Sequence, residues 1–425
     1  MTTRYVFIHL PGSRDAVPAG KLDMATDATG EFANARFAYG NIYLKRHDAL
    51  DVDPVSLPRD GAAGKTLLPV NGLPMFSAIR DAAPDAWGRQ VIENRLQRPG
   101  PLPEWMYLDH AGSDRAGALD IRPDRDSTPL ASTLPSAIDL NYLLDAAERI
   151  EAGEPVPAQL THYFQGGPTM GGMRPKAVIA VDGRQFVAKF PSRTDRFNVP
   201  SVERATLELA REAGLHVPET RLMQMPDGRT VMLIERFDRV AGPGGLITRR
   251  HMVSALTMLG VGEMDSRYRS YADIAHAISR QAPGARVAAD RTEMFSRMVF
   301  NILVSNSDDH LRNHAFLYQE TGGWALSPLY DVVPTPSHSL ERNLHLIVGE
   351  MGRAARVDNA LTSAGQFGLR RAEAAEIIDR IYRVARSWRQ TFERHEVTAQ
   401  DCDLVASAFM HEDHIGMREA MSKGG

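Results

Sequence analysis

Apolar residues in the second half of the chain repeat with helical spacing. They fall at Met294, Phe295, Met298, Val299, Ile302 and Leu303. This i, i+1, i+4, i+5, i+8, i+9 pattern predicts a helix over 291–304 that buries one broad stripe. Two short apolar runs follow, 315–318 and 324–326, with Thr321-Gly322-Gly323 between them, and they predict a hairpin.

The N-terminal pattern is different, because short apolar runs there alternate with turn residues. Strands are predicted at 5–10, 36–39 and 42–44, the last two around Gly40-Asn41. Helical spacing follows at 77–98, where Pro84 predicts either a turn and a helix or two helices, and again at 138–151. Residues 153–157 then read as a linker.

The middle of the chain predicts two hairpins with a helix between them. Strands at 176–181 and 185–190 flank Asp182-Gly183, a strong hairpin signal. A helix follows through Ala213, with Ser201 as the expected N-cap and Gly214 just past its end. Strands at 221–225 and 229–235 form the second hairpin. After Gly245 the pattern is helical, with helices predicted at 251–259, 271–279, 291–304, 371–393 and 401–409.

Composition narrows the class of protein. The chain has 425 residues, 43% of them hydrophobic, which is enough for two or three domains or one large two-lobed enzyme. Its net charge of −4 does not favour a protein that coats nucleic acid. The single cysteine, Cys402, excludes an internal disulfide and fits a reducing cytoplasm. No apolar run approaches the roughly 20 residues of a membrane span, and residues 1–10 lack the core of a signal peptide.

The polar loop after the helix at 291–304 carries the first candidate chemistry. Asp308 and Asn313 are five residues apart, and Asp331 follows the hairpin. Helix, loop, hairpin and aspartate occur in this order in a kinase catalytic lobe, where one Asp orients the acceptor hydroxyl while an Asn and a second Asp hold Mg²⁺. The same spacing is compatible with a polar surface loop that contains capping residues.

A second candidate region lies between residues 166 and 245. A Gly-rich loop at 166–172 could bring backbone N–H groups close to an anion, and Lys189 lies in the strand that follows. Each feature alone also fits a plain turn or a solvated strand face. Glu203 could pair with Lys189, or could simply be favoured by the helix dipole. The segment 235–239 followed by 242–245 is where a hinge between lobes would fall.

Taken together, these segments resemble the HipA family, the toxin kinases of bacterial type II toxin–antitoxin modules. The matching segments are Gly172-Met173-Arg174-Pro175-Lys176-Ala177, Val187-Ala188-Lys189-Phe190-Pro191-Ser192, Ala213-Gly214-Leu215-His216-Val217-Pro218, Glu235-Arg236-Phe237-Asp238-Arg239, Asn306-Ser307-Asp308-Asp309-His310-Leu311-Arg312-Asn313-His314 and Leu326-Ser327-Pro328-Leu329-Tyr330-Asp331. The resemblance implies an α+β, two-lobed protein-kinase-like fold. Its parts would be a β-rich N-terminal subdomain (1–115), a kinase N lobe (116–240) and a helical catalytic C lobe (241–425).

The resemblance also implies a role for each matching residue. Asp308 would orient or deprotonate the acceptor hydroxyl, and Asn313 and Asp331 would hold Mg²⁺. The residues expected to bind ATP are Gly167, Thr169, Met170, Gly171, Gly172, Lys189, Glu235, Phe237 and Arg312. Family members phosphorylate a serine in the Gly-rich loop, and here the matching residue is Thr169. Arg312 stands where a Lys is common, and His310 is expected to be structural.

The resemblance further implies an aminoacyl-tRNA synthetase as protein substrate, and a helix-turn-helix antitoxin of the HipB type through which operator DNA is bound. Three other functions remain open at this point. The acceptor could be a small molecule, or the chain could be a degenerate kinase that only binds a repressor. A metal hydrolase using Asp308, Asp309 and His310 is the third.

Overall fold

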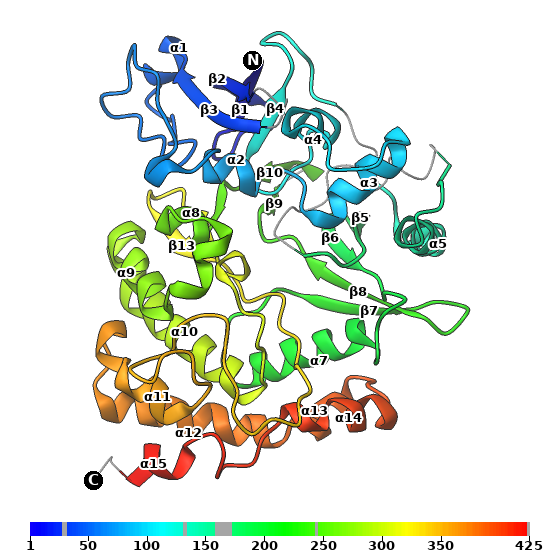
Figure 1. Ribbon diagram of the computed structural model, residues 1–425, viewed down its shortest axis with the longest axis vertical. Coiled ribbons are helices and arrows are strands. Elements are labelled where there is room, and N and C mark those ends of the chain that lie inside the picture. The colour runs from blue at the N-terminus through cyan, green and yellow to red at the C-terminus, as the bar shows by residue number, and fades with distance from the viewer. Residues whose placement is uncertain (28–31, 131–133, 158–171, 243–244, 423–425) are drawn as a thin grey trace. The chain divides into compact units, whose positions relative to one another are not determined.

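The computed structural model describes residues 1–27, 32–130, 134–157, 172–242 and 245–422 (Figure 1). The chain divides into two compact units, and each is built from two segments. The first comprises residues 1–193 and 233–261, and the second comprises residues 194–232 and 262–425. None of the helices in the described ranges has the length and apolar character that crossing a bilayer requires.

The first unit begins with an antiparallel sheet of order β3-β2-β1-β4. The strands are β1 (Thr2–His9), β2 (Ala16–Thr26), β3 (Phe32–Tyr39) and β4 (Leu119–Arg122). The helices of this unit are α1 (Asn41–Leu44), α2 (Ser77–Asp81), α3 (Ala86–Leu96), α4 (Glu104–His110), α5 (Leu140–Glu151) and α8 (Ala255–Leu259). Its remaining strands are β5 (Lys176–Val181), β6 (Arg184–Lys189), β9 (Arg239–Ala241), β10 (Ile247–Arg249) and β11 (Met252–Ser254).

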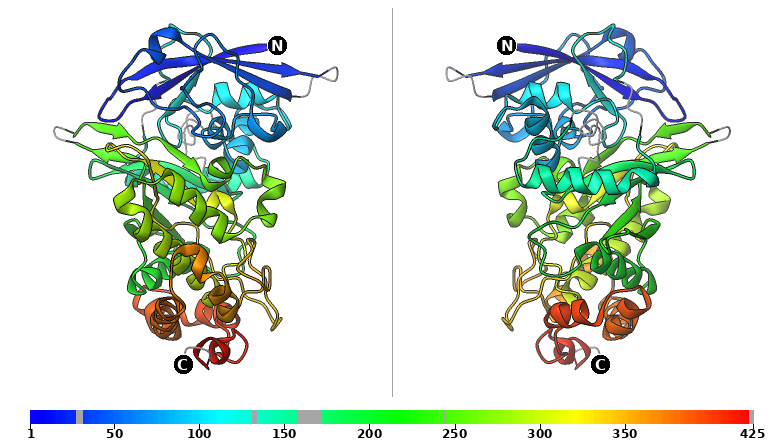
Figure 2. Two further views of the ribbon diagram at one scale, coloured as in Figure 1. Left: turned by 90° about the vertical axis from the view of Figure 1, so that its left-hand side faces the viewer. Right: turned by 90° about the vertical axis from the view of Figure 1, so that its right-hand side faces the viewer.

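The second unit is mostly helical. Its helices are α7 (Val199–Glu212), α9 (Tyr271–Gln281), α10 (Gly284–Leu303), α11 (Val357–Thr362), α12 (Arg371–Arg386), α13 (Trp388–Arg394), α14 (Ala399–Val405) and α15 (Met417–Ser422). Its strands are β7 (Thr220–Gln224), β12 (Ala315–Tyr318) and β13 (Trp324–Leu326). Helices α12 to α14 follow one another in Figure 1, and both views of Figure 2 show this orange and red part of the unit from its ends. Strand β8 (Thr230–Glu235) is divided, with its first three residues in this unit and its last three in the first.

Local patterns account for the elements that position the candidate site. The stripe on α10 is buried as predicted, and Met294, Phe295, Met298 and Val299 are each fully inaccessible. Strands β12 and β13 have the predicted bounds and pair with Phe316 opposite Leu326. The turn between β5 and β6 places Asp182 and Gly183 at φ of 51° and 74°, which is the backbone that an Asp-Gly hairpin turn requires.

Four local predictions were wrong. The single helix expected at 371–393 is two helices, α12 and α13, which meet at Ser387. Residues 42–44 form part of helix α1 and not a strand, because the buried Tyr43 hydroxyl donates to Leu50 O and accepts from Leu50 N, which draws this segment into a compact turn. Met252–Ser254 is strand β11, so helix α8 begins only at Ala255, where the Ser254 side chain caps it. The N-cap of α7 is Asn198, whose side-chain oxygen accepts from the backbone N–H of Ser201.

The predicted α+β class is confirmed by the presence of both sheets and helices in these units. The three predicted domain ranges stay a prediction. Strand β2 and helix α4 were not identified from the sequence. The first six residues of β2 include Pro18, Gly20 and Lys21, which are uncommon in strands, and α4 is only seven residues long.

Candidate functional site

The polar loop of the second unit starts where α10 ends. Helix α10 stops at Leu303, and Ser305 takes a left-handed φ of 53° that turns the chain away from the helix axis. The backbone N–H of Asn306 then donates to Asn301 O at 2.9 Å, which closes the helix end. Ser307, Asp308 and His310 emerge from this turn with exposed or partly exposed side chains, whereas Asp309 between them is buried.

Asp308 and Asn313 are joined within this loop. The side-chain Nδ2 of Asn313 donates to the backbone oxygen of Asp308 at 3.1 Å, and the N–H of His310 donates to the same oxygen at 2.9 Å. The Asp308 side chain is exposed, whereas Asn313 is buried. The loop therefore presents one carboxylate to solvent and holds one amide beneath it.

The amide oxygen of Asn313 is left without a donor. Because its nitrogen is used by Asp308 O, its Oδ1 must face the other way, and in the described part of the chain that buried oxygen accepts no hydrogen bond. A buried polar oxygen without a partner is unfavourable unless something binds it. An amide oxygen is the kind of ligand that a hard cation such as Mg²⁺ prefers.

The hairpin β12–β13 brings the segment of Asp331 back to this loop. Ser327 N donates to Ala315 O at 2.8 Å and so continues the ladder past β13. The Tyr330 hydroxyl then donates to Arg312 O at 2.6 Å, which ties the residue before Asp331 to the residue before Asn313. Asp331 itself has a φ of 60°, an uncommon conformation for a non-glycine residue. The sequence-predicted residues Asp308, Asn313 and Asp331 thus belong to one hydrogen-bonded substructure.

Sequence reasoning considered Asp309 only for the hydrolase alternative and missed that its buried carboxylate supports this loop. The Oδ2 atom of Asp309 accepts from the Tyr271 hydroxyl at 2.6 Å, from Asn301 Nδ2 at 2.7 Å and from His314 Nε2 at 2.9 Å. We call Asp309, Tyr271, Asn301 and His314 the Asp309 network. Burial by itself would raise the pKa of Asp309, but the neighbouring His314 and the Tyr271 hydroxyl hold that pKa below its ordinary value. Burial and the Asp309 charge raise the pKa of Tyr271 well above 10, so its hydroxyl remains a donor.

One sequence signal could have pointed to the Asp309 network. Asn301 is an uncharged polar residue inside the apolar end of α10, where it is fully buried. A buried amide in an apolar helix needs a partner, and the adjacent polar loop is the nearest source of one. The hydrolase alternative gains no support, because among the described residues no group of three His, Cys, Asp or Glu side chains could hold a metal ion.

Arg312, predicted to bind ATP, forms an ion pair in the second unit. Its Nη2 lies 2.8 Å from Glu263 Oε1, a side chain that is about half exposed (54%). His310, predicted to be structural, lies edge-on to His345 with 5.9 Å between the ring centroids. Burial lowers the pKa of His345 below its ordinary value, so this ring favours the neutral form.

The other predicted residues lie in the first unit. Lys189 is the last residue of β6 and stands opposite Lys176 across the hairpin. Lys176 is buried and bonded to Asp85, with 2.5 Å between Nζ and Oδ2. The two central lysines therefore differ: the charge of Lys176 is matched inside the unit, whereas Lys189 is partly exposed at the end of its strand.

The segment after β8 carries the two residues predicted to frame an adenine. Glu235 is partly exposed, and its Oε1 lies 3.2 Å from Arg184 Nη1. The next residue, Arg236, donates its backbone N–H to Gln185 O of β6 at 2.9 Å, so this segment is held beside the strand of Lys189. Phe237 is also partly exposed.

Part of the predicted Gly-rich loop lies outside the described residues. Gly167, Thr169, Met170 and Gly171 are the predicted ATP-binding residues that fall outside the described ranges. Gly172 is described and has a φ of 114°, a conformation that only glycine adopts readily. A Cβ built there would lie 3.0 Å from Lys176 Nζ.

Comparisons with known proteins bear on the family and the fold of this chain. Residues 169–388, more than half of the chain, match the family model described as a HipA-like C-terminal domain. Y4mE of Sinorhizobium fredii (strain NGR234), which carries a provisional kinase name, is 25% identical over 353 residues, covering 77% of this chain and 80% of that protein. The serine/threonine-protein kinase toxin HipA of Shewanella oneidensis MR-1 is 25% identical over 249 residues, covering 52% of this chain and 54% of that protein.

A solved structure extends the likeness to the whole fold. It is the complex of HipA, HipB and operator DNA from the Shewanella oneidensis MR-1 toxin–antitoxin system. Its matching chain has a TM-score of 0.67 at 18% identity, with 98% of this chain and 97% of that chain covered. This likeness confirms the predicted two-lobed, kinase-like α+β fold. The matched family model, which spans the Asp308–Asn313 loop and Asp331, together with this fold, shows that the chain belongs to the HipA family of kinases.

Proposed function

We propose that this chain is an ATP- and Mg²⁺-dependent serine/threonine protein kinase that acts as the toxin of a HipA/HipB-like module. The observation that carries the proposal is the buried amide oxygen of Asn313, which accepts no hydrogen bond from any described residue and lies beneath the exposed Asp308 carboxylate. An oxygen ligand for a hard cation next to an accessible carboxylate is the arrangement that phosphoryl transfer to a hydroxyl requires.

In this proposal each residue has a separate task. Asp308 accepts a hydrogen bond from the acceptor hydroxyl and orients its oxygen for attack. Asn313 Oδ1 and the Asp331 carboxylate hold Mg²⁺, which neutralises charge on the phosphates when it is bound. Lys189 and Arg312 contact phosphate oxygens, Glu235 and Phe237 frame the adenine, and Gly167–Gly172 cover the phosphates. Since phosphoryl transfer depends mainly on positioning and charge neutralisation, the rigidity of the loop matters as much as its charges.

We infer the finer functions from the family. The acceptor is a serine or threonine of a protein, and an aminoacyl-tRNA synthetase is the substrate that would let one kinase halt translation. Thr169 is the proposed autophosphorylation site. The partner is a HipB-like helix-turn-helix antitoxin. Operator DNA is bound mainly through this partner, because the net charge of −4 on this chain does not favour direct binding to DNA phosphates. The single cysteine favours a cytoplasmic location.

A transfer assay tests the kinase proposal. The protein is incubated with Mg²⁺ and γ-labelled ATP, alone and with a panel of aminoacyl-tRNA synthetases, and labelled sites are mapped by mass spectrometry. Asp308→Asn should lower transfer by about 10²- to 10⁴-fold, the usual contribution of a positioned acid–base group. Asp331→Ala should do so by removing a cation ligand.

The controls decide between alternatives. Thr169→Ala should abolish the self-labelling. Undiminished transfer by Asp308→Asn or Asp331→Ala would contradict the assignment of the site. Label on small metabolites and never on protein would favour a small-molecule kinase. A chain that forms the antitoxin complex but binds no nucleotide would favour a non-catalytic partner.

A further inference from the structure

The first unit contains a buried group of two arginines and two aspartates that the proposed reaction does not use. Arg236, Asp238 and Arg239 follow strand β8, and Asp114 comes from a turn just before β4; we call these four residues the arginine–aspartate cluster. The side chains are between 1% and 9% exposed, so the cluster is nearly withdrawn from solvent.

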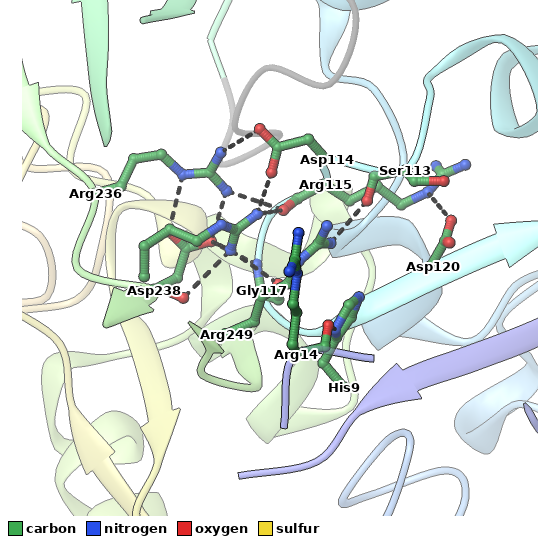
Figure 3. Close-up of polar contacts among 11 residues, drawn as sticks. His9, Arg14, Ser113, Asp114, Arg115, Gly117, Asp120, Arg236, Asp238 and Arg249 are labelled. Atoms are coloured by element: carbon green, nitrogen blue, oxygen red, sulfur yellow. Dashed lines mark hydrogen bonds and ion pairs between the residues drawn. The ribbon is translucent and has the colours of Figure 1, made fainter. Parts of the chain in front are cut away.

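Each carboxylate in the cluster is shared by both arginines. Asp238 lies 2.9 Å from Arg236 Nη2 and 2.8 Å from Arg239 Nη1. Asp114 lies 3.1 Å from Arg236 Nη1 and 2.5 Å from Arg239 Nη2. Figure 3 shows Asp114 and Asp238 on opposite sides of the Arg236 guanidinium. The planar guanidinium groups make these contacts directional, so the cluster admits only a narrow range of backbone positions.

Backbone atoms complete the connection between residues 114–117 and 236–239. Both arginines donate to Arg115 O, at 3.0 Å from Arg236 and 2.7 Å from Arg239. Gly117 N–H donates to Asp238 Oδ2 at 2.8 Å, and Gly117 O accepts from Arg239 at 3.1 Å. Gly117 has a φ of 71°, and a Cβ there would lie 3.0 Å from the backbone nitrogen of Met252, so this close approach requires glycine.

The cluster holds the segment that carries Glu235 and Phe237. Arg236 and Asp238 are buried, whereas Glu235 and Phe237, which alternate with them, are only partly buried. The Arg236 N–H also donates to Gln185 O of β6, four residues before Lys189. Residues 235–238 are therefore fixed from two directions, by the strand of Lys189 and by the turn at 114–117.

We propose that Asp114, Arg239 and the turn at 114–117 are positioning residues for the nucleotide, although none of them touches it. They fix the backbone of residues 235–237 so that the adenine-framing groups stand at a set distance from Lys189. The inference rests on the proposed function, because it assumes that Glu235 and Phe237 frame an adenine. A buried ion network suits this task, since an apolar contact would allow the segment to slide, whereas the directional bonds between guanidinium and carboxylate groups do not.

The test measures the affinity for MgATP by calorimetry, KM and kcat for transfer, and the melting temperature of the full chain. The variants are Asp114→Asn, which removes one charge, and Arg239→Lys, which keeps the charge but removes the planar guanidinium group. Both should raise Kd and KM for MgATP about tenfold or more, while kcat at saturating ATP falls much less, because the displaced group lies at the adenine and not at the reacting phosphate. Arg239→Lys decides the question if Asp114→Asn does not fold.

Asp120→Asn is the matched control. Asp120 is more deeply buried than Asp114, with side chains 1% and 9% exposed, and it is paired with an arginine, 2.7 Å from Arg122 Nε. It also lies 3.9 Å from the Arg115 side chain, but among the described residues it does not bond to residues 235–239 or to the Arg115 backbone oxygen that Arg236 and Arg239 share. This variant should change the melting temperature and leave KM for MgATP within about twofold of the wild type. An unchanged KM in Asp114→Asn and Arg239→Lys, with only a lower melting temperature, would show a merely structural role and overturn the inference. Wild-type protein that binds no MgATP would overturn the proposed function as well, so the two failures are distinguishable.

Discussion

The Asp309 network of the second unit and the arginine–aspartate cluster of the first are two different solutions to the burial of aspartate. Asp309 is held by a hydroxyl, an amide and an imidazole, whereas Asp114 and Asp238 are each held by two guanidinium groups. In both regions the partners hold the carboxyl pKa below its ordinary value against the opposing effect of burial. A hydroxyl, an amide and an imidazole hold the single carboxylate of Asp309, and guanidinium groups are present where two carboxylates lie together.

The two regions also differ in the chain distance that they bridge. Asn301 and His314 are 8 and 5 residues from Asp309, and Tyr271 is 38 residues away. The bonds from Arg236 and Arg239 to residues 114 and 115 span 121 to 125 residues. The first region shapes a single loop, whereas the second joins distant parts of its unit. Loss of the first should act on catalysis and local order, and loss of the second on the geometry of a whole segment.

The largest expected effect comes from comparing two adjacent carboxylates. Asp309→Ala leaves three buried donors without their acceptor and should lower the free energy of unfolding by about 4 kcal/mol or more, since each unpaired buried group costs about 1–3 kcal/mol. Urea denaturation measures the change. Asp308→Asn, at the exposed neighbouring position, should change stability by no more than about 0.5 kcal/mol. Equal stability losses at the two positions would contradict the description of the Asp309 network.

A smaller effect is expected in the cluster, where a double variant sharpens the comparison. Arg236→Met leaves the two buried carboxylates with Arg239 as the remaining arginine of the cluster, and should cost about 3 kcal/mol, the lower end for breaking a buried ion pair. The double variant Arg236→Met with Asp238→Leu removes both partners and should be less destabilised than the sum of the two single variants. Denaturant unfolding of all four proteins completes the cycle. Simple additivity would show that the two side chains do not interact.

The smallest effect at neutral pH comes from a buried histidine of the first unit, because its contribution to stability changes only below about pH 6.5. His251 is buried, its Nε2 lies 3.0 Å from Val52 O, and its Nδ1 accepts from the Met252 N–H, so the ring is held neutral. Burial lowers the pKa of His251 to about 4. Because the unfolded chain has the ordinary histidine pKa of about 6.5, protons bind the unfolded state first and stability falls as pH decreases from about 6.5 to 4.

This loss should reach up to about 3 kcal/mol, at 1.36 kcal/mol per pKa unit. His251→Gln, which keeps a donor toward Val52 O, should flatten part of the slope, and free energies of unfolding measured at several pH values test this. His9, whose pKa burial lowers to about 3, contributes in the same direction and should account for part of the remaining slope. An unchanged slope in His251→Gln would assign the whole dependence to other groups. The carboxylates with lowered pKa values lose their contribution only below about pH 4.

What the sequence determined by itself is local. The apolar stripe of α10, the bounds of β12 and β13, and the Asp182-Gly183 turn follow from spacing and turn chemistry that act over a few residues. The loop spacing of Asp308 and Asn313, and the resemblance to one family, gave the candidate residues in the second unit. These signals survive in any context because neighbouring residues alone produce them.

What only the tertiary structure decided is which polar residues are buried and against what. The sequence marks Asp309 and Asp114 no differently from exposed aspartates such as Asp308, because burial depends on neighbours tens or more than a hundred residues away. The folded structure also decided that residues 42–44 are helical, since the bonds of the Tyr43 hydroxyl to Leu50, seven residues away, outweigh a short run of strand-favouring side chains. Side-chain pairing across such distances is a property of the folded chain, and no local pattern encodes it.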